Sequence, residues 1–266
     1  MKIGYLGPVG TFSNEACDNC FDETYEKIPY KTIKETIIAL KNSKVDKCII
    51  PVENSLQGCV TEAIDTFIQN ENIYVEKEYI LKINQNLMAK EKYNLKDIKI
   101  VYSHIQAISQ CRNYLEENLK TAEIKEVLST ALGAKYALEN DYSACIGNIS
   151  CTEKYGLKLL DKDIQDNNLN QTKFWILSKK INKSSDKKKI SIIFTTKHVP
   201  GALYKVLGIF DKYNINLTKI ESRPAKTNLG EYYFLVDFNI DKIDVTNALN
   251  ELRENANYSR ILGIYN

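Results

Sequence analysis

Up to about residue 178, apolar residues along the chain follow two alternating spacings. Short apolar runs typical of buried strands occupy residues 3–6, 48–52, 98–102 and 143–147. Between them, apolar residues recur at helical spacing, as in the sets Ile33, Ile37, Leu40 and Val60, Ile64, Phe67. Strands that alternate with helices predict an α/β sheet with helices packed on it. The less regular stretch 73–88 is expected to carry the chain into a second lobe, with a ligand cleft between the lobes.

Beyond a lysine- and serine-rich segment the pattern changes. Residues 179–189 read KKINKSSDKKK, a composition typical of a solvated linker. After it we expect a strand at 190–196, a helix from Pro200 to about Tyr213, strands at 217–222 and 232–238, a helix with the apolar face Val245, Ala248, Leu249 and Leu252, and a strand at 261–264. This β-α-β-β-α-β order is the ferredoxin-like plan. We therefore predict a first domain over 1–180, a linker over 181–189 and a second domain over 190–266.

Composition and charge narrow the class of protein. Hydrophobic residues make up 44% and charged residues 26% of the chain, as in ordinary globular proteins. The net charge of +2 gives no basic field that would attract nucleic acid. The chain shows no secretory leader and no apolar run near the ~18 residues of a membrane span, so we expect a cytoplasmic protein. The odd count of seven cysteines predicts free thiols, and the lone Cys17-x-x-Cys20 lacks the second pair or histidines that a metal site needs.

Small and hydroxyl-bearing residues gather where strands are expected to turn into helices. These joins are 7–13 with Thr11 and Ser13, 51–58 with Glu53, Asn54 and Ser55, 103–107 with Ser103 and Gln106, and 129–134. Helix capping explains any one of them. Free backbone N–H groups at helix starts also bind anions. Their repetition in one α/β domain favours a small anionic ligand.

The sequence patterns that nucleophilic catalysis and nucleotide binding require are not found. The two histidines, His104 and His198, stand near no nucleophile elbow, and His198 lies beyond the predicted linker. The chain has no Walker loop and no dinucleotide fingerprint. Near the end of the first domain, a polar cluster that begins at Asn170 leads into an apolar strand, and Thr172 and Lys173 lie at the start of that strand. Composition alone would make this an ordinary strand start.

Short motifs along the chain resemble one family in order. They are YLGPVGTFS at 5–13, PVENSLQGCV at 51–60, SHIQAISQC at 103–111, the run 146–166, NQTKF at 170–174, and, after the linker, GAL at 201–203 with ESRP at 221–224. Together they resemble the monofunctional prephenate dehydratases with a C-terminal ACT domain, along essentially the whole chain. The resemblance implies a two-lobed catalytic domain like a periplasmic binding protein. Two positions depart from the family pattern, since Lys173 replaces an arginine and Ile105 a proline.

The resemblance also implies an activity and its residues. Prephenate would lose carbon dioxide and its ring hydroxyl to give phenylpyruvate, with no cofactor. Thr172 would act on the leaving group, and the substrate would be held by Lys173, Phe174, Asn170, Thr11, Ser13, Glu53, Asn54, Ser55, Ser103 and Gln106. Phenylalanine would be the allosteric effector, bound by Gly201, Ala202, Leu203, Glu221, Ser222, Arg223 and Pro224. ACT domains pair across subunits, which implies a homodimer or homotetramer.

Two alternatives stay open at this point. An arogenate dehydratase would run the same elimination on a substrate with an amino group in place of the keto oxygen. A non-catalytic amino-acid sensor would bind a ligand in the same two-lobed domain, and lysine at position 173 leaves room for lost activity. The threonine at 172 argues against the sensor.

Overall fold

The computed structural model describes residues 1–181, 188–225, 230–240 and 245–266, so most of the predicted linker at 181–189 lies outside the described residues. The chain forms two compact units, one of residues 1–66 with 79–174 and one of residues 67–78 with 175–266. The second unit thus includes two segments that precede the predicted linker. Among the helices that the structure describes, none is long and apolar enough to cross a membrane.

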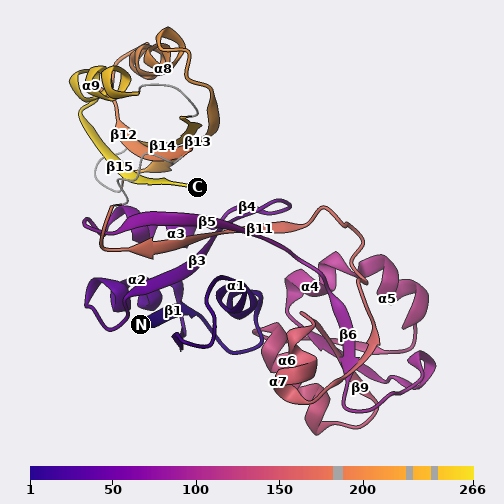
Figure 1. The fold of residues 1–266 in the computed structure, drawn as a ribbon. Coiled ribbons are helices and arrows are strands. Elements are labelled where there is room, and N and C mark those ends of the chain that lie inside the picture. Colours follow the sequence, from indigo (N-terminus) through magenta and orange to yellow (C-terminus); the bar gives the residue numbers. More distant parts are fainter. Residues whose placement is uncertain (182–187, 226–229, 241–244) are drawn as a thin grey trace. The chain divides into compact units, whose positions relative to one another are not determined.

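The first lobe of the first unit is a sheet with helices packed on it, as the hydrophobic pattern predicts, and its strand β1 pairs parallel with both neighbours (Figure 1). Strands β2 (Glu26–Tyr30) and β3 (Lys47–Asn54) flank β1 (Lys2–Leu6), and β11 (Gln171–Ser178) lies beside β3. Helices α1 (Phe12–Cys20) and α2 (Ile33–Lys41) pack on this sheet, while α3 (Thr61–Ile68) follows the short strand β4 (Gly58–Cys59). Ile37 and Leu40 are fully buried, which confirms the helical face predicted for them.

The second lobe is a separate mixed sheet with its own helices. Its strands are β6 (Asn86–Ala89), β7 (Ile100–Ser103), β8 (Glu123–Glu126), β9 (Ser143–Gly147) and β10 (Lys158–Asp161), in the order β10-β6-β9-β7-β8. Its helices are η1 (Leu95–Asp97), α4 (Ile105–Gln110), α5 (Arg112–Asn118), α6 (Thr130–Glu139) and α7 (Ser150–Tyr155). Strand β5 (Tyr74–Lys82) leads into β6, so the stretch 73–88 does carry the chain into the second lobe.

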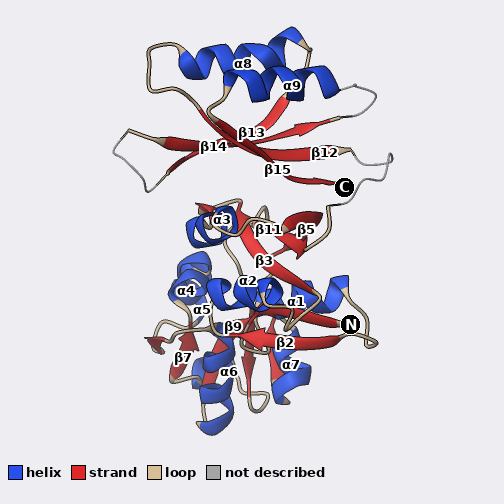
Figure 2. Ribbon diagram, turned by 90° about the vertical axis from the view of Figure 1, so that its left-hand side faces the viewer, coloured by secondary structure: helices blue, strands red, loops and turns tan. Residues whose placement is uncertain are grey.

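The C-terminal part of the second unit has the predicted β-α-β-β-α-β order. Its elements are β12 (Lys189–Thr195), α8 (Ala202–Lys212), β13 (Leu217–Pro224), β14 (Tyr232–Asn239), α9 (Thr246–Asn255) and β15 (Tyr258–Tyr265). The strands form an antiparallel sheet in the order β13-β14-β12-β15. Both helices cover one face of this sheet (Figure 2). The buried side chains of Phe194, Phe210 and Phe238 lie in the core between the sheet and the helices.

The second unit also ties β15 to the segment 67–78. The Arg260 guanidinium donates hydrogen bonds to the carbonyl oxygens of Ile68 (3.2 Å) and Phe67 (3.5 Å), the last carbonyls of α3. Lys189 forms an ion pair with Glu78 at 2.8 Å. A chain cut near residue 180 would leave this segment without its partners, so tests of effector binding need the full chain.

Candidate functional site

A cavity of about 550 Å³ opens in the first unit, lined by both of its lobes. Of the residues predicted to act on a substrate, six line this cavity: Thr11, Ser13, Asn54, Gln106, Thr172 and Phe174. They come from the start of α1 with its cap, the end of β3, α4 and β11, which lie far apart in the sequence. Folding therefore brings most of the predicted set around one space.

Capping side chains of three helices face this cavity. Thr11 Oγ1 accepts from Asn14 N at the start of α1 (3.3 Å), Ser129 Oγ from Leu132 N at the start of α6 (3.1 Å), and His104 Nδ1 from Gln106 N at the start of α4 (3.2 Å). All three capping residues line the cavity. Since helix starts carry partial positive charge, their convergence favours a negatively charged ligand.

The join at 51–58 is a hairpin, and the prediction of a strand turning into a helix there is wrong. Strands β3 and β4 pair antiparallel, with Asn54 opposite Gly58. Asn54 Oδ1 accepts from the backbone N–H groups of Leu56 (3.0 Å) and Gln57 (3.1 Å), which closes a tight turn. Gly58 supplies the positive φ of +78° that completes it.

The same asparagine orients Thr172. Asn54 Nδ2 donates to Thr172 Oγ1 at 3.0 Å and also lies within 2.8 Å of Asn170 Oδ1. The orientation of the amide follows from the network, because its oxygen already accepts two backbone N–H groups. With a donor on its oxygen, the Thr172 hydroxyl has its own proton available for an acceptor in the cavity.

Five predicted substrate ligands are not among the cavity-lining residues. Lys173 Nζ pairs with Glu53 Oε2 at 3.1 Å, on the side of β11 opposite to Thr172 and Phe174. Ser55 Oγ donates to Leu169 O (3.1 Å) and accepts from Gln171 N (2.9 Å), and Asn170 is buried beneath Asn54. Ser103 is fully buried and its hydroxyl donates to Ile146 O at 2.7 Å, between β7 and β9. A role in substrate binding stays a prediction for these five.

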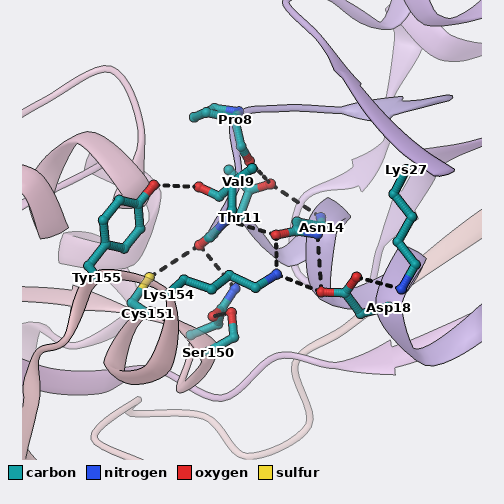
Figure 3. Close-up of polar contacts among 12 residues, drawn as sticks. Pro8, Val9, Thr11, Asn14, Asp18, Lys27, Ser150, Cys151, Lys154 and Tyr155 are labelled. Carbon is teal, nitrogen blue, oxygen red and sulfur yellow. Dashed lines mark hydrogen bonds and ion pairs between the residues drawn. The ribbon is translucent and has the colours of Figure 1, made fainter. Parts of the chain in front are cut away.

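The loop of residues 8–11 lines the cavity with Pro8 and Thr11, and the second lobe holds it in place (Figure 3). Tyr155 donates its hydroxyl to Val9 O at 2.7 Å. Gly10 O accepts from Asn148 Nδ2 (3.2 Å) and from the Cys151 thiol (3.3 Å). Burial raises the pKa of Cys151 to about 12, so this thiol keeps its proton and can donate. We call residues 8–11 the gripped loop.

Charged residues extend this contact along α1. Lys154 Nζ of α7 lies 2.6 Å from Asp18 Oδ2 and also donates to Asn14 Oδ1, while Lys27 Nζ lies 2.9 Å from Asp18 Oδ1 (Figure 3). Partial burial acts to raise the pKa of Asp18, but hydrogen bonds from Lys154 and Lys27 outweigh it and the pKa is lowered. Asp18 is therefore ionised at neutral pH and links α1 to α7.

The cavity also holds residues that the sequence patterns did not single out. Gln85 Nε2 donates to Gln110 Oε1 at 3.0 Å, and Lys31 lies just before α2. Lys31 directly follows strand β2 and precedes Thr32, whose hydroxyl caps α2. The same strand-to-helix signal as at the other joins was therefore present, but β2 itself was not predicted.

Comparisons with known proteins show the family of this chain. The family model for prephenate dehydratase matches residues 3–182, and the one for the ACT domain matches residues 190–257. The chain belongs to the prephenate dehydratase family. It is 34% identical to the prephenate dehydratase of Bacillus subtilis strain 168, over 100% of this chain and 98% of that protein. It is 35% identical to a bifunctional chorismate mutase/prephenate dehydratase of Aquifex aeolicus, over 100% of this chain and 73% of that protein.

A solved structure extends the likeness to the fold. The prephenate dehydratase of Arthrobacter aurescens in complex with L-Phe superposes with a TM-score of 0.90 at 30% identity, over 100% of this chain and 89% of that one. The family and this fold make the chain a dehydratase of the lyase class with a C-terminal ACT domain. The sequence motifs at 5–13, 51–60 and 170–174 had indicated this family, and the assignment is confirmed.

The ACT domain of this chain has a cavity of its own, of about 640 Å³. Gly201, Ala202 and Leu203 line it, while Glu221, Ser222, Arg223 and Pro224 are not among its lining residues. The second group lies on β13, where Ser222 and Pro224 pair with the cavity residues Phe234 and Tyr232. Gly201 has a φ of +77° and no side chain caps α8. Ala202 N donates to Val199 O at 3.2 Å, so the next amides, those of Leu203 and Tyr204, are the ones at the cavity.

Proposed function

We propose that the cavity of the first unit is the active site and that Thr172 is the catalytic residue. The hydrogen bond from Asn54 Nδ2 to Thr172 Oγ1 inside a cavity lined by helix starts carries this proposal. In the reaction, the bond between the ring and its carboxylate breaks and its electron pair enters the ring as carbon dioxide leaves. The ring hydroxyl departs as water, taking the proton that Thr172 donates. Both losses make the ring aromatic.

Threonine is a weak acid, so donation concerted with bond breaking is the favoured course. The amide of Asn54 stabilises the oxygen as its proton moves away, and solvent must return that proton after each turnover. Positioned proton donation contributes about 10²–10⁴-fold to a rate. Thr11 and Ser13, at the start of α1, are placed to bind a substrate carboxylate, and Phe174 offers an apolar surface to the ring.

The decisive test is turnover by the purified full chain, with prephenate and with arogenate as parallel substrates. We expect phenylpyruvate to form from prephenate at pH 7 without added metal or nucleotide. The uncatalysed decay of prephenate at the same pH is the baseline. Product formation no faster than that baseline would favour the amino-acid sensor, and a higher kcat/KM on arogenate would favour the arogenate dehydratase.

We further propose that phenylalanine binds the ACT cavity and inhibits the reaction. The amides at the start of α8 suit the carboxylate of an amino acid, and Leu203 and Phe234 offer apolar contacts for its ring. Inhibition requires that phenylalanine bind the less active state more tightly, and by reciprocity substrate must then weaken phenylalanine binding. Assembly as a homodimer or homotetramer and a cytoplasmic location belong to the same proposal.

Gly201→Ala is expected to weaken phenylalanine binding at least tenfold in calorimetry on the full chain. A residue with a side chain is strained by about 1–2 kcal/mol at a left-handed φ, and relief of that strain moves the first amides of α8. Gly156→Ala is the matched control, because Gly156 also has a positive φ (+70°) and an added Cβ would meet no atom within 4 Å, but it lies in the first unit. Equal phenylalanine affinity in the wild type and both variants would contradict this location of the effector.

A further inference from the structure

The charge of the catalytic cavity comes from one side chain. Among its lining residues, all within the described part of the chain, Lys31 is the one lysine or arginine, and none is an aspartate or glutamate. The remaining polar groups are hydroxyls, amides and His104. A substrate with two carboxylates would therefore meet helix starts and a single full positive charge.

The backbone of Lys31 is held in place, while its ammonium is available. Thr32 Oγ1 accepts from Glu35 N at 3.0 Å and caps α2, and Glu35 Oε2 in turn accepts from Lys31 N at 3.2 Å. Within the described residues, the Lys31 ammonium has no carboxylate within 4.0 Å. Lys173, by contrast, pairs with Glu53 and does not line the cavity.

We propose that Lys31 binds a carboxylate of the substrate and favours the keto acid over its amino-acid analogue. This inference rests on the proposed function. Prephenate carries two negative charges, and arogenate carries the same two with an added ammonium. Lys31 attracts the carboxylates of both, but the ammonium of arogenate meets a positive side chain and no acidic partner in the lining. The preference for prephenate thus arises from the arogenate ammonium, which has no acidic partner in the lining, as much as from the attraction of Lys31 for a carboxylate.

The test compares the steady-state kinetics of lysine variants on prephenate. Lys31→Met is expected to raise KM roughly ten- to a hundredfold, the factor that corresponds to one charged hydrogen bond, with a much smaller change in kcat. Lys31→Arg, which keeps the charge, should stay near wild type. Lys34→Met is the matched control: Lys34 is an exposed lysine three residues further along the chain that does not line this cavity.

Two further measurements make the result decisive. The ratio of kcat/KM on prephenate to that on arogenate should fall in Lys31→Met, since the residue that disfavours the ammonium is gone. Raised salt should increase the KM of the wild type more than that of Lys31→Met, because the lost attraction is screened.

Several outcomes separate this inference from the proposed function. If the wild type does not turn over prephenate, the proposed function itself is wrong. A wild type that does, with Lys31→Met matching it in KM and in substrate ratio, overturns the role of Lys31 alone. A strong rise in KM for Lys173→Met but none for Lys31→Met would assign the carboxylate to Lys173 instead. Should Lys31→Met fail to fold by circular dichroism, Lys31→Gln serves for the same comparison.

Discussion

Replacing Thr172 by alanine is expected to lower kcat on prephenate by about 10²–10⁴-fold, the contribution of a positioned proton donor. Alanine removes the hydroxyl that faces the cavity but leaves the cavity walls in place. Prephenate should still bind, because its carboxylates are held by other groups. The measurement is kcat from steady-state kinetics, with substrate affinity from calorimetry on the same variant.

Two companion variants distinguish loss of the proton donor from a general disturbance. Thr172→Ser keeps the hydroxyl and should retain substantial activity. Asn54→Asp keeps the oxygen that accepts from Leu56 N and Gln57 N, but replaces the amide that donates to Thr172 Oγ1. The threonine would then donate to that carboxylate, so kcat should fall while the turn persists. Wild-type kcat in Thr172→Ala would remove Thr172 from the mechanism.

Gly10→Ala is expected to lower kcat/KM about a hundredfold through the gripped loop. The new Cβ would lie 2.7 Å from Tyr155 Cε2 and 3.4 Å from Cys151 Sγ, at a φ of +87°. The loop has to move because Tyr155 and Cys151, which the new Cβ meets, are the same side chains that hydrogen-bond to the loop. A misplacement of about 1 Å near reacting groups costs about 10²-fold, and Thr11 at the start of α1 moves with the loop.

The control for Gly10→Ala is Gly156→Ala, which strains the backbone at φ +70° but meets no atom within 4 Å. Both variants should lose stability in urea unfolding, and only Gly10→Ala should lose activity. Adding Tyr155→Leu removes the ring that causes the clash. The loss of kcat/KM in the double variant should therefore be smaller than the product of the losses in the two single variants. Full activity in Gly10→Ala would show that the grip of the second lobe does not position the cavity wall.

Local sequence determined much of the fold. The helical spacing of Ile33, Ile37 and Leu40 has one stable solution, a helix with that face on the sheet, and the structure has it. The order of elements after residue 188 was likewise predictable, because each strand and helix carries its own period. The turn at Asn54 was misjudged because a capping residue and a hairpin turn use the same side-chain hydrogen bond to backbone N–H groups.

The site depended on contacts that local patterns do not contain. Alternation along β11 means that Thr172 and Phe174 share one face and Lys173 takes the other, but the sequence period does not say which face meets the cavity. Motif resemblance chose Thr172, while only folding set it beside Asn54, 118 residues earlier, and turned Lys173 to Glu53. Tertiary packing alone brings Lys31 to the cavity and Tyr155 to the gripped loop. Packing between distant segments is decided by the shape and burial of whole lobes rather than by neighbours in the chain.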